Sequence, residues 1–219
     1  MIEKELAGFI DHTILKADCS KDAILKVCSE AKEYGFAAVC IPPYWVKTSV
    51  SLLESTPSKV ATVIGFPMGY SATASKVEEI KRAIDDGADE LDVVVNLCAL
   101  KEGNWNYVKN DISTMITAVH LKGKIIKVIL ETGLLTIDEI KKVSEICLEL
   151  GADFIKTSTG FNGGGATIEA VEAMKAVVGD KVKIKASGGI RTAKDAISFL
   201  EAGADRLGCS SGVAIVTEK

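Results

Sequence analysis

Charged residues alternate with apolar ones in five short segments of the sequence that otherwise look like buried strands. These charged residues are Asp11, Asp92, Lys127, Lys156 and Lys185. Successive residues of a strand point to opposite faces of a sheet, so the apolar neighbours would cover one face and the charged residues the other. Buried charges are costly unless they are paired. The pattern therefore predicts a buried cluster of lysines and aspartates that has a functional role.

Crowded lysines suit the chemistry of an amine nucleophile. A free lysine has a pKa of roughly 10.4, and only its neutral form attacks a carbonyl. Burial and a neighbouring cation both favour the neutral form. Lys156 and Lys185 fall in consecutive strand candidates with matching facing, so we expect Lys156 to bind a carbonyl substrate covalently and Lys185 to keep it deprotonated. Asp92 and Asp11 would relay protons, with Lys127 in support. The alternative is a purely structural ion-pair network.

Glycine-rich stretches follow three of the strand candidates at their carboxyl ends. Their candidate anion-binding residues are Gly160, Gly188, Gly189, Ser210 and Ser211. In α/β barrels the loops after strands seven and eight, together with a helix N-terminus, commonly bind phosphate through backbone N–H groups. The alternative is that these glycines only form turns. The residues thus predict a phosphorylated carbonyl substrate without identifying it.

The elements that position these residues alternate along the chain. Strands are predicted at 9–15, 37–41, 61–66, 90–96, 125–131, 154–159, 183–187 and 206–210. Helical patterns lie at 20–34, 44–54, 72–86, 104–121, 136–150, 167–178, 192–202 and 211–217. Eight strand–helix units predict an α/β fold, a closed (β/α)8 TIM barrel, with 1–219 as a single domain. An open doubly wound sheet is the alternative, although no G-x-G-x-x-G motif follows the first strand.

Composition excludes several classes of protein. The net charge of −4 argues against a general binder of nucleic acid or anionic membranes. No segment has about 20 consecutive apolar residues, and the first residues lack the apolar run of a signal peptide. Six cysteines without a C-x-x-C pair predict free thiols in a reducing cytoplasm, and the absence of a Cys/His cluster predicts an enzyme that needs no metal.

Long stretches of the sequence, in the same order, resemble the deoxyribose-phosphate aldolases, which are class I aldolases. The most specific stretches are 87–94, 154–160 and 185–192, and 11–15 and 127–133 add support. The resemblance implies reversible cleavage of 2-deoxy-D-ribose 5-phosphate to acetaldehyde and D-glyceraldehyde 3-phosphate, in deoxynucleoside breakdown. It also implies a lysine imine with the substrate and no separate cofactor, in a cytoplasmic homodimer.

The resemblance also implies roles for individual residues. Lys156 forms the Schiff base, Lys185 keeps its amine deprotonated and Asp92 relays protons. Residues implied around the phosphate are Gly160, Gly188, Gly189, Ser210 and Ser211. Residues implied in the substrate pocket are Thr13, Leu15, Cys40 and Thr157. The sequence departs from the family at Phe161, where other members carry a lysine near the phosphate, so phosphate affinity should rest more on backbone donors.

Some members of that family end in a tyrosine that assists proton transfer, whereas this sequence ends in Thr217-Glu218-Lys219. We therefore expect that proton transfer to be slower or to rely on water. Two other functions remain open on the sequence. One is a different Schiff-base sugar-phosphate aldolase with another preferred donor, and the other is a barrel that binds a phosphate ester without catalysis.

Overall fold

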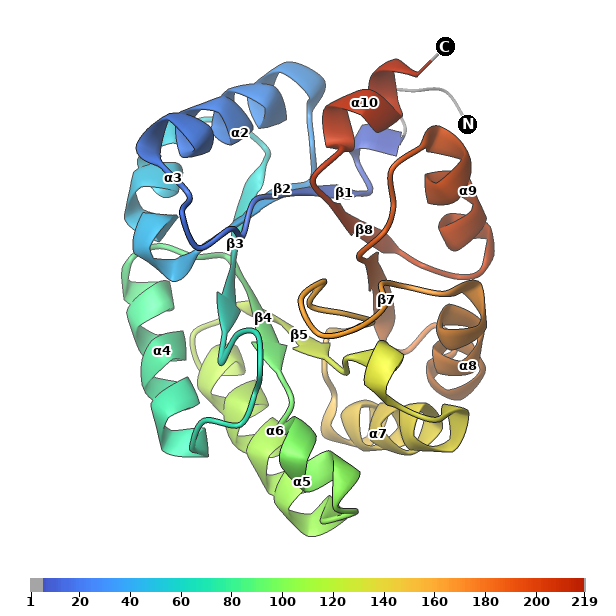
Figure 1. Ribbon diagram of the computed structural model, residues 1–219. Coiled ribbons are helices and arrows are strands. Elements are labelled where there is room, and N and C mark those ends of the chain that lie inside the picture. The colour runs from blue at the N-terminus through green and yellow to red at the C-terminus, as the bar shows by residue number, and fades with distance from the viewer. Residues whose placement is uncertain (1–5, 219) are drawn as a thin grey trace.

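Eight parallel strands form a closed barrel in the computed structural model, which describes residues 6–218. The strands are β1 (Ile10–Thr13), β2 (Ala38–Ile41), β3 (Lys59–Ile64), β4 (Glu90–Val94), β5 (Ile125–Ile129), β6 (Phe154–Lys156), β7 (Lys183–Ser187) and β8 (Arg206–Cys209). Each strand pairs with the next in the chain, and β8 pairs with β1 (Figure 1). The predicted (β/α)8 barrel is confirmed, and the open doubly wound sheet is wrong.

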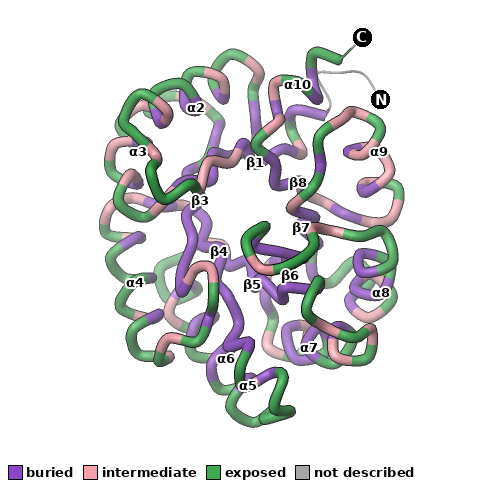
Figure 2. The backbone as a smooth tube through the Cα atoms, viewed as in Figure 1, coloured by how far each residue is buried: buried purple, intermediate pink, exposed green. Residues whose placement is uncertain are grey.

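Helices surround the barrel and cover the outer face of the sheet (Figure 1). They are α2 (Lys21–Tyr34), α3 (Val46–Leu53), α4 (Thr73–Asp85), α5 (Leu97–Lys101), α6 (Trp105–His120), α7 (Ile137–Leu150), α8 (Ile168–Val178), α9 (Ala193–Glu201) and α10 (Gly212–Thr217). Two short 3-10 turns accompany them, η1 (Pro43–Trp45) and η2 (Thr132–Leu134). Figure 2 shows the strands buried along their length, while each helix is buried on one side and exposed on the other.

Local sequence sets the ends of several helices. Thr136 begins α7 and Thr192 begins α9 with a capping box, in which the threonine side chain and an acidic side chain three residues later satisfy each other's backbone N–H groups. Gly35 and Gly151 end α2 and α7 in the left-handed conformation that favours glycine. These signals explain why the helix predictions were accurate to within one or two residues at these ends.

Three details differ from the sequence predictions. The strand expected at 61–66 is shifted toward the N-terminus, at Lys59–Ile64, and the strand expected at 154–159 ends at Lys156. The short helix α5 was not predicted; Asn96 begins it by accepting a hydrogen bond from the backbone N–H of Ala99. Its five residues are too few for a helical period to be visible in the sequence.

A buried ion pair fixes the loop between β3 and α4. Lys76 on α4 and Asp111 on α6 are both fully buried, with 2.6 Å between Nζ and the carboxylate. Lys76 Nζ also donates to the backbone carbonyls of Gly69 and Val94, at 3.2 Å each. Burial lowers the pKa of Lys76 although Asp111 acts in the opposite direction. The pair therefore joins two helices, one loop and the end of β4.

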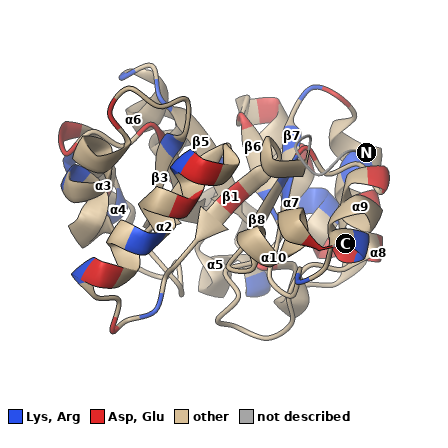
Figure 3. Cartoon of the chain, turned by 90° about the horizontal axis from the view of Figure 1, so that it is seen from above, with Lys and Arg blue, Asp and Glu red and all other residues tan. Residues whose placement is uncertain are grey.

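Within residues 6–218, no helix is both long and apolar enough to cross a membrane. Acidic and basic residues both occur on the outer helices (Figure 3). The first five residues, on which the signal-peptide expectation rests, and Lys219 lie outside the described residues.

Candidate active site

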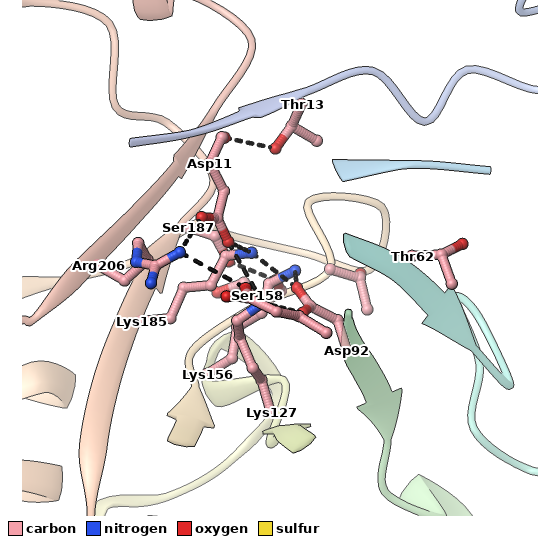
Figure 4. Close-up of polar contacts among 12 residues, drawn as sticks. Asp11, Thr13, Thr62, Asp92, Lys127, Lys156, Ser158, Lys185, Ser187 and Arg206 are labelled. Carbon is pink, nitrogen blue, oxygen red and sulfur yellow. Dashed lines mark hydrogen bonds and ion pairs between the residues drawn. The ribbon is translucent and has the colours of Figure 1, made fainter. Parts of the chain in front are cut away.

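The five charged residues predicted to face inward meet inside the barrel (Figure 4). Asp11, Asp92, Lys127 and Lys185 are fully buried, and Lys156 is 3% exposed. Each comes from a different strand, and the register pairs Lys156 with Lys185 and Asp92 with Lys127 across adjacent strands. Strand alternation thus identified the inward side chains correctly, because both neighbours of each charged residue in its strand are packed outward.

Asp92 lies at the centre of this cluster. Its Oδ1 accepts a hydrogen bond from Lys127 Nζ at 2.8 Å. Its Oδ2 accepts from both Lys156 Nζ, at 2.9 Å, and Lys185 Nζ, at 2.7 Å. Lys156 and Lys185 therefore share one carboxylate oxygen, which brings their amines close together and gives a short route for a proton between them.

Asp11, on β1, contacts two of these lysines, Lys185 and Lys127. Its Oδ2 lies 2.5 Å from Lys185 Nζ and 3.4 Å from Lys127 Nζ. Its Oδ1 accepts from Arg206 Nη1 at 2.6 Å. Glu90 completes the cluster, 2.5 Å from Lys127 and 3.5 Å from Arg206.

Sequence reasoning did not include Glu90 and Arg206 in this cluster. A signal was present, because both residues are two positions from an inward residue of the same strand: Glu90 precedes Asp92, and Arg206 precedes Gly208, which packs against Lys185. The alternation that identified Asp92 applies equally to Glu90. Both stand at the first position of their strands, where a charged side chain is often exposed.

The cluster carries one more cation than it has carboxylates among the described residues. We call the seven charged side chains the barrel cluster: Asp11, Glu90, Asp92, Lys127, Lys156, Lys185 and Arg206. Lys127 is paired with three of its carboxylates and Lys185 with two, but Lys156 is paired only with Asp92. Lys156 is therefore the lysine of the barrel cluster with the fewest carboxylate partners.

The neighbours of these groups shift their pKa values in consistent directions. Burial opposes ionisation of Asp92, but Lys127, Lys156 and Lys185 together hold the pKa of its carboxyl well below the usual range. Burial likewise opposes ionisation of Asp11, and Lys185, Lys127 and Arg206 outweigh it and lower that pKa as well. For Lys185, burial lowers the pKa, but Asp11 and Asp92 raise it overall. Lys185 is thus a stable cation beside Lys156.

A pocket of about 360 Å³ opens above Lys156. Its wall contains the predicted residues Thr13, Leu15, Lys156, Gly160, Gly188, Gly189 and Ser210. Two cations that sequence reasoning did not identify, Lys16 and Arg191, also line it. Glycine suits positions 160, 188 and 189 because each has a positive φ, of 83°, 87° and 85°.

Three of the residues predicted for the substrate pocket or the phosphate lie outside this wall. Thr157 is fully buried, and its hydroxyl bonds to the backbone of Ser187, where it joins β6 to β7. Cys40 is fully buried in a small apolar group below the pocket, and burial raises the pKa of its thiol. Ser211 lines a neighbouring groove between α2 and α10. Leu15, which lines the pocket, packs against the group that contains Cys40, so Cys40 lies directly behind the pocket wall.

Two other side chains of this region have partners away from the barrel cluster. The Nε2 of His12 lies 2.7 Å from Glu30 on α2, and the His12 ring packs on Phe36. The carboxylate of Glu131 accepts hydrogen bonds from Thr159 and Asn162 in the loop after β6. Among residues 6–218, no group of three or more His, Cys, Asp or Glu side chains is arranged to hold a metal ion.

Comparisons with known proteins agree with this geometry. Residues 6–218 match the family described as DeoC/LacD family aldolase. A deoxyribose-phosphate aldolase from Caldicellulosiruptor saccharolyticus is 51% identical over 219 residues, which covers 100% of both chains. A solved structure from Coccidioides immitis has a TM-score of 0.95 and 46% identity, covering 100% of this chain and 86% of the other. A tetrameric deoxyribose phosphate aldolase from Aeropyrum pernix has a TM-score of 0.91 and 32% identity, covering 98% and 90%.

Proposed function

The chain belongs to the DeoC/LacD family of aldolases, and we propose that it is a deoxyribose-phosphate aldolase with Lys156 as its Schiff-base lysine. It cleaves 2-deoxy-D-ribose 5-phosphate reversibly to acetaldehyde and D-glyceraldehyde 3-phosphate. This function explains why an amine, its neighbouring cation and a proton-relaying carboxylate all lie beneath one pocket.

One observation carries the proposal. Lys156 is the lysine of the barrel cluster that reaches the pocket, and it is also the one with a single carboxylate partner. Lys185 is a cation beside it, because Asp11 and Asp92 raise the pKa of Lys185 despite its burial. A neutral amine in contact with the pocket is what attack on an aldehyde requires.

The reaction follows from these positions. The neutral Nζ of Lys156 attacks C1 of the open-chain sugar, and loss of water leaves a protonated imine. A base removes the proton from the C3 hydroxyl, the C2–C3 bond breaks, and its electron pair moves into the imine to form an enamine. D-glyceraldehyde 3-phosphate leaves, a proton returns to C2, and water hydrolyses the imine to release acetaldehyde. Asp92 contacts both Lys156 and Lys185, so we assign the proton relay to it.

The phosphate is assigned to the loops above the barrel. Gly188, Gly189 and Ser210 lie in the pocket wall with Gly160, and their backbone N–H groups are suitable donors to an anion. Phe161 also lines the pocket and contributes no charge. Lys16 and Arg191 supply positive charge at the same wall, so the loss of a lysine at position 161 need not leave the site without cations.

Borohydride trapping tests the nucleophile directly. Acetaldehyde and borohydride should convert one lysine to its N-ethyl derivative, and peptide mass mapping should locate the ethyl group on Lys156. Lys156→Ala should give no adduct, while Lys181→Ala, which removes an exposed lysine near β7, should be labelled like the wild type.

An Lys156→Ala variant that is still labelled at a single buried lysine would show that the nucleophile is misassigned. Wild-type protein that binds a phosphate ester but gives no adduct would instead support a non-catalytic barrel. Comparing acetaldehyde with dihydroxyacetone phosphate as the donor separates this activity from that of other Schiff-base sugar-phosphate aldolases.

We also propose that the enzyme forms one domain, works as a homodimer in the cytoplasm and needs no cofactor apart from the imine. The six cysteines are all free, which suits a reducing compartment. Light scattering coupled to size-exclusion chromatography measures the subunit number, with the tetrameric state of the Aeropyrum pernix protein as the competing result. Full activity after treatment with a chelator would support the absence of a metal.

A further inference from the structure

Glu131 directly follows the barrel strand β5 in an unusual backbone conformation. Its φ of 60° and ψ of 57° lie in the left-handed region, which is disfavoured for a residue with a Cβ. Its two neighbours are paired with the β6 segment: the N–H of Leu130 donates to the carbonyl of Lys156 at 2.9 Å, and the N–H of Thr132 donates to that of Thr157 at 2.8 Å. The chain is thus held on both sides while Glu131 turns its side chain away from the strand direction.

The Glu131 carboxylate is fully buried. Among residues 6–218, it accepts hydrogen bonds only from the loop after β6. It accepts a hydrogen bond from the backbone N–H of Thr159 at 3.1 Å and one from the hydroxyl of the same residue. It also accepts from Asn162 Nδ2 at 3.2 Å. No ion pair to Glu131 occurs among residues 6–218. These three hydrogen bonds are therefore the interactions that offset the free-energy cost of burying the charged carboxylate.

These contacts continue into the wall of the substrate pocket. Thr159 Oγ1 accepts from the backbone N–H of Phe161 at 3.1 Å, so Glu131 acts through Thr159 on the residues either side of Gly160. Asn162 Nδ2 donates also to the carbonyl of Pro67, and the ring of Phe161 stands edge-on to Phe66. Thr159, Gly160 and Phe161 all line the pocket, whereas Glu131 does not.

The other end of the same loop is anchored independently. The backbone N–H of Ala166 donates to the carbonyls of Ser187 and Gly188, at 3.0 Å each. Gly165 approaches Gly188 so closely that an added Cβ would lie 2.1 Å from the Gly188 carbonyl oxygen. Residues 165–166 therefore stay with β7 whatever happens at Glu131. The segment whose position depends on Glu131 is 159–162, which contains Gly160.

We propose that Glu131 is a positioning residue for phosphate recognition, which holds the segment 159–162 so that the backbone N–H of Gly160 faces the anion. The inference rests on the proposed function for the identity of the substrate, but it assigns to Glu131 a task separate from covalent catalysis. A carboxylate suits this task because it offers only acceptors to three donors. A glutamine at 131 would turn an NH2 group toward at least one of those donors and lose that bond.

Glu131→Gln should therefore weaken binding of the phosphate and leave the chemistry largely intact. Loss of one hydrogen bond to a charged group corresponds to about a tenfold rise in KM for 2-deoxyribose 5-phosphate. KM for unphosphorylated 2-deoxyribose should change less than about twofold, and kcat for either sugar less than about threefold. The reason is that Lys156 and Asp92, which carry out the chemistry, are unchanged. Trapping of acetaldehyde on Lys156 should match the wild type.

Matched variants separate positioning from general damage to the fold. Glu172→Gln makes the same chemical change at an exposed site on α8 and should behave as the wild type. Thr159→Val removes the hydroxyl that passes the contact to Phe161 and should reproduce the selective rise in KM. Thr159→Ser keeps the hydroxyl and should restore the value. The Thr159 pair keeps the test decisive if Glu131→Gln fails to fold.

Inorganic phosphate provides a readout that needs no activity. It should raise the melting temperature of the wild type and of Glu172→Gln, and raise that of Glu131→Gln clearly less. Equal losses for the phosphorylated and unphosphorylated sugars, or an unchanged phosphate response, would overturn the role of Glu131. Failure of the wild type to trap acetaldehyde would instead count against the proposed function, and the phosphate response would still judge Glu131.

Discussion

Replacing Lys185 by methionine tests whether the second cation controls the reactive amine. Methionine has a similar unbranched shape, so it fills the space of the lysine stem without its charge. Asp11 keeps contacts with Lys127 and Arg206, and Asp92 keeps contacts with Lys127 and Lys156. No carboxylate of the barrel cluster is left unpaired, so the variant should fold.

The magnitude follows from the shared oxygen of Asp92. Lys185 Nζ lies 2.7 Å and Lys156 Nζ 2.9 Å from this atom. Two unit charges about 5 Å apart repel each other by about 3 kcal/mol at an effective dielectric constant of about 20. Removing that repulsion makes the neutral form of the Lys156 amine roughly a hundredfold rarer. Asp92 Oδ2 would then accept a hydrogen bond from Lys156 alone, which also favours the charged form of the Lys156 amine.

The assay is the pH dependence of kcat/KM together with the rate of acetaldehyde trapping. Near pH 7, Lys185→Met should reduce both by roughly a hundredfold, since only the neutral amine reacts. The deficit should shrink as the pH rises, because deprotonation by the solvent replaces the missing cation. The acidic limb of the profile should therefore move upward by about two pH units. Lys181→Met, at an exposed position, is the matched control.

Two results would refute this reasoning. A profile of unchanged shape, lower by a constant factor at every pH, would mean that Lys185 shapes the site without controlling the charge of Lys156. A profile whose acidic limb shifts downward would mean that Lys185 does not favour the neutral form of the Lys156 amine. Circular dichroism and melting temperature should first establish that the variant is folded.

The remaining predictions concern stability. Asp111→Asn should lower the free energy of unfolding by about 3 kcal/mol, because it leaves the buried Lys76 without its partner; urea unfolding measures this, and a loss below about 1 kcal/mol would contradict it. The wild type should lose stability as the pH falls below about 4. Because the folded chain lowers the pKa of Asp11, only the unfolded chain binds a proton at this carboxylate in that pH range, which favours unfolding. Asp11→Asn should be less stable at pH 7 and should depend less on pH below about 4; an equal slope in urea titrations between pH 5 and 2 would show that Asp11 contributes nothing.

The sequence alone determined the architecture and the inward face of the strands. Eight apolar segments separated by helical patterns predict one barrel, because parallel strands need helical crossovers. A strand has a side-chain period of two, so a charged residue between apolar ones had to face the interior. That rule places Lys156, Lys185 and Asp92 together inside the barrel from the sequence alone.

Only the tertiary structure decided which groups touch. Lys185 and Asp11 are 174 residues apart in the chain, and their contact exists because β8 closes the barrel onto β1. Strand alternation says that side chains face inward, but not which of three carboxylates each lysine reaches, since this depends on the register between strands. Glu90 and Arg206, one acidic and one basic, join the barrel cluster without changing its excess of one cation.

The loops were the least predictable part for the same reason. A loop has no side-chain period, so nothing in the sequence connects Glu131 with Thr159 or turns Thr157 away from the pocket. Their directions come from a left-handed residue after β5 and from hydrogen bonds to a neighbouring strand. Periodicity fixes the side-chain direction within a strand, whereas contacts between distant segments fix it where the strand ends.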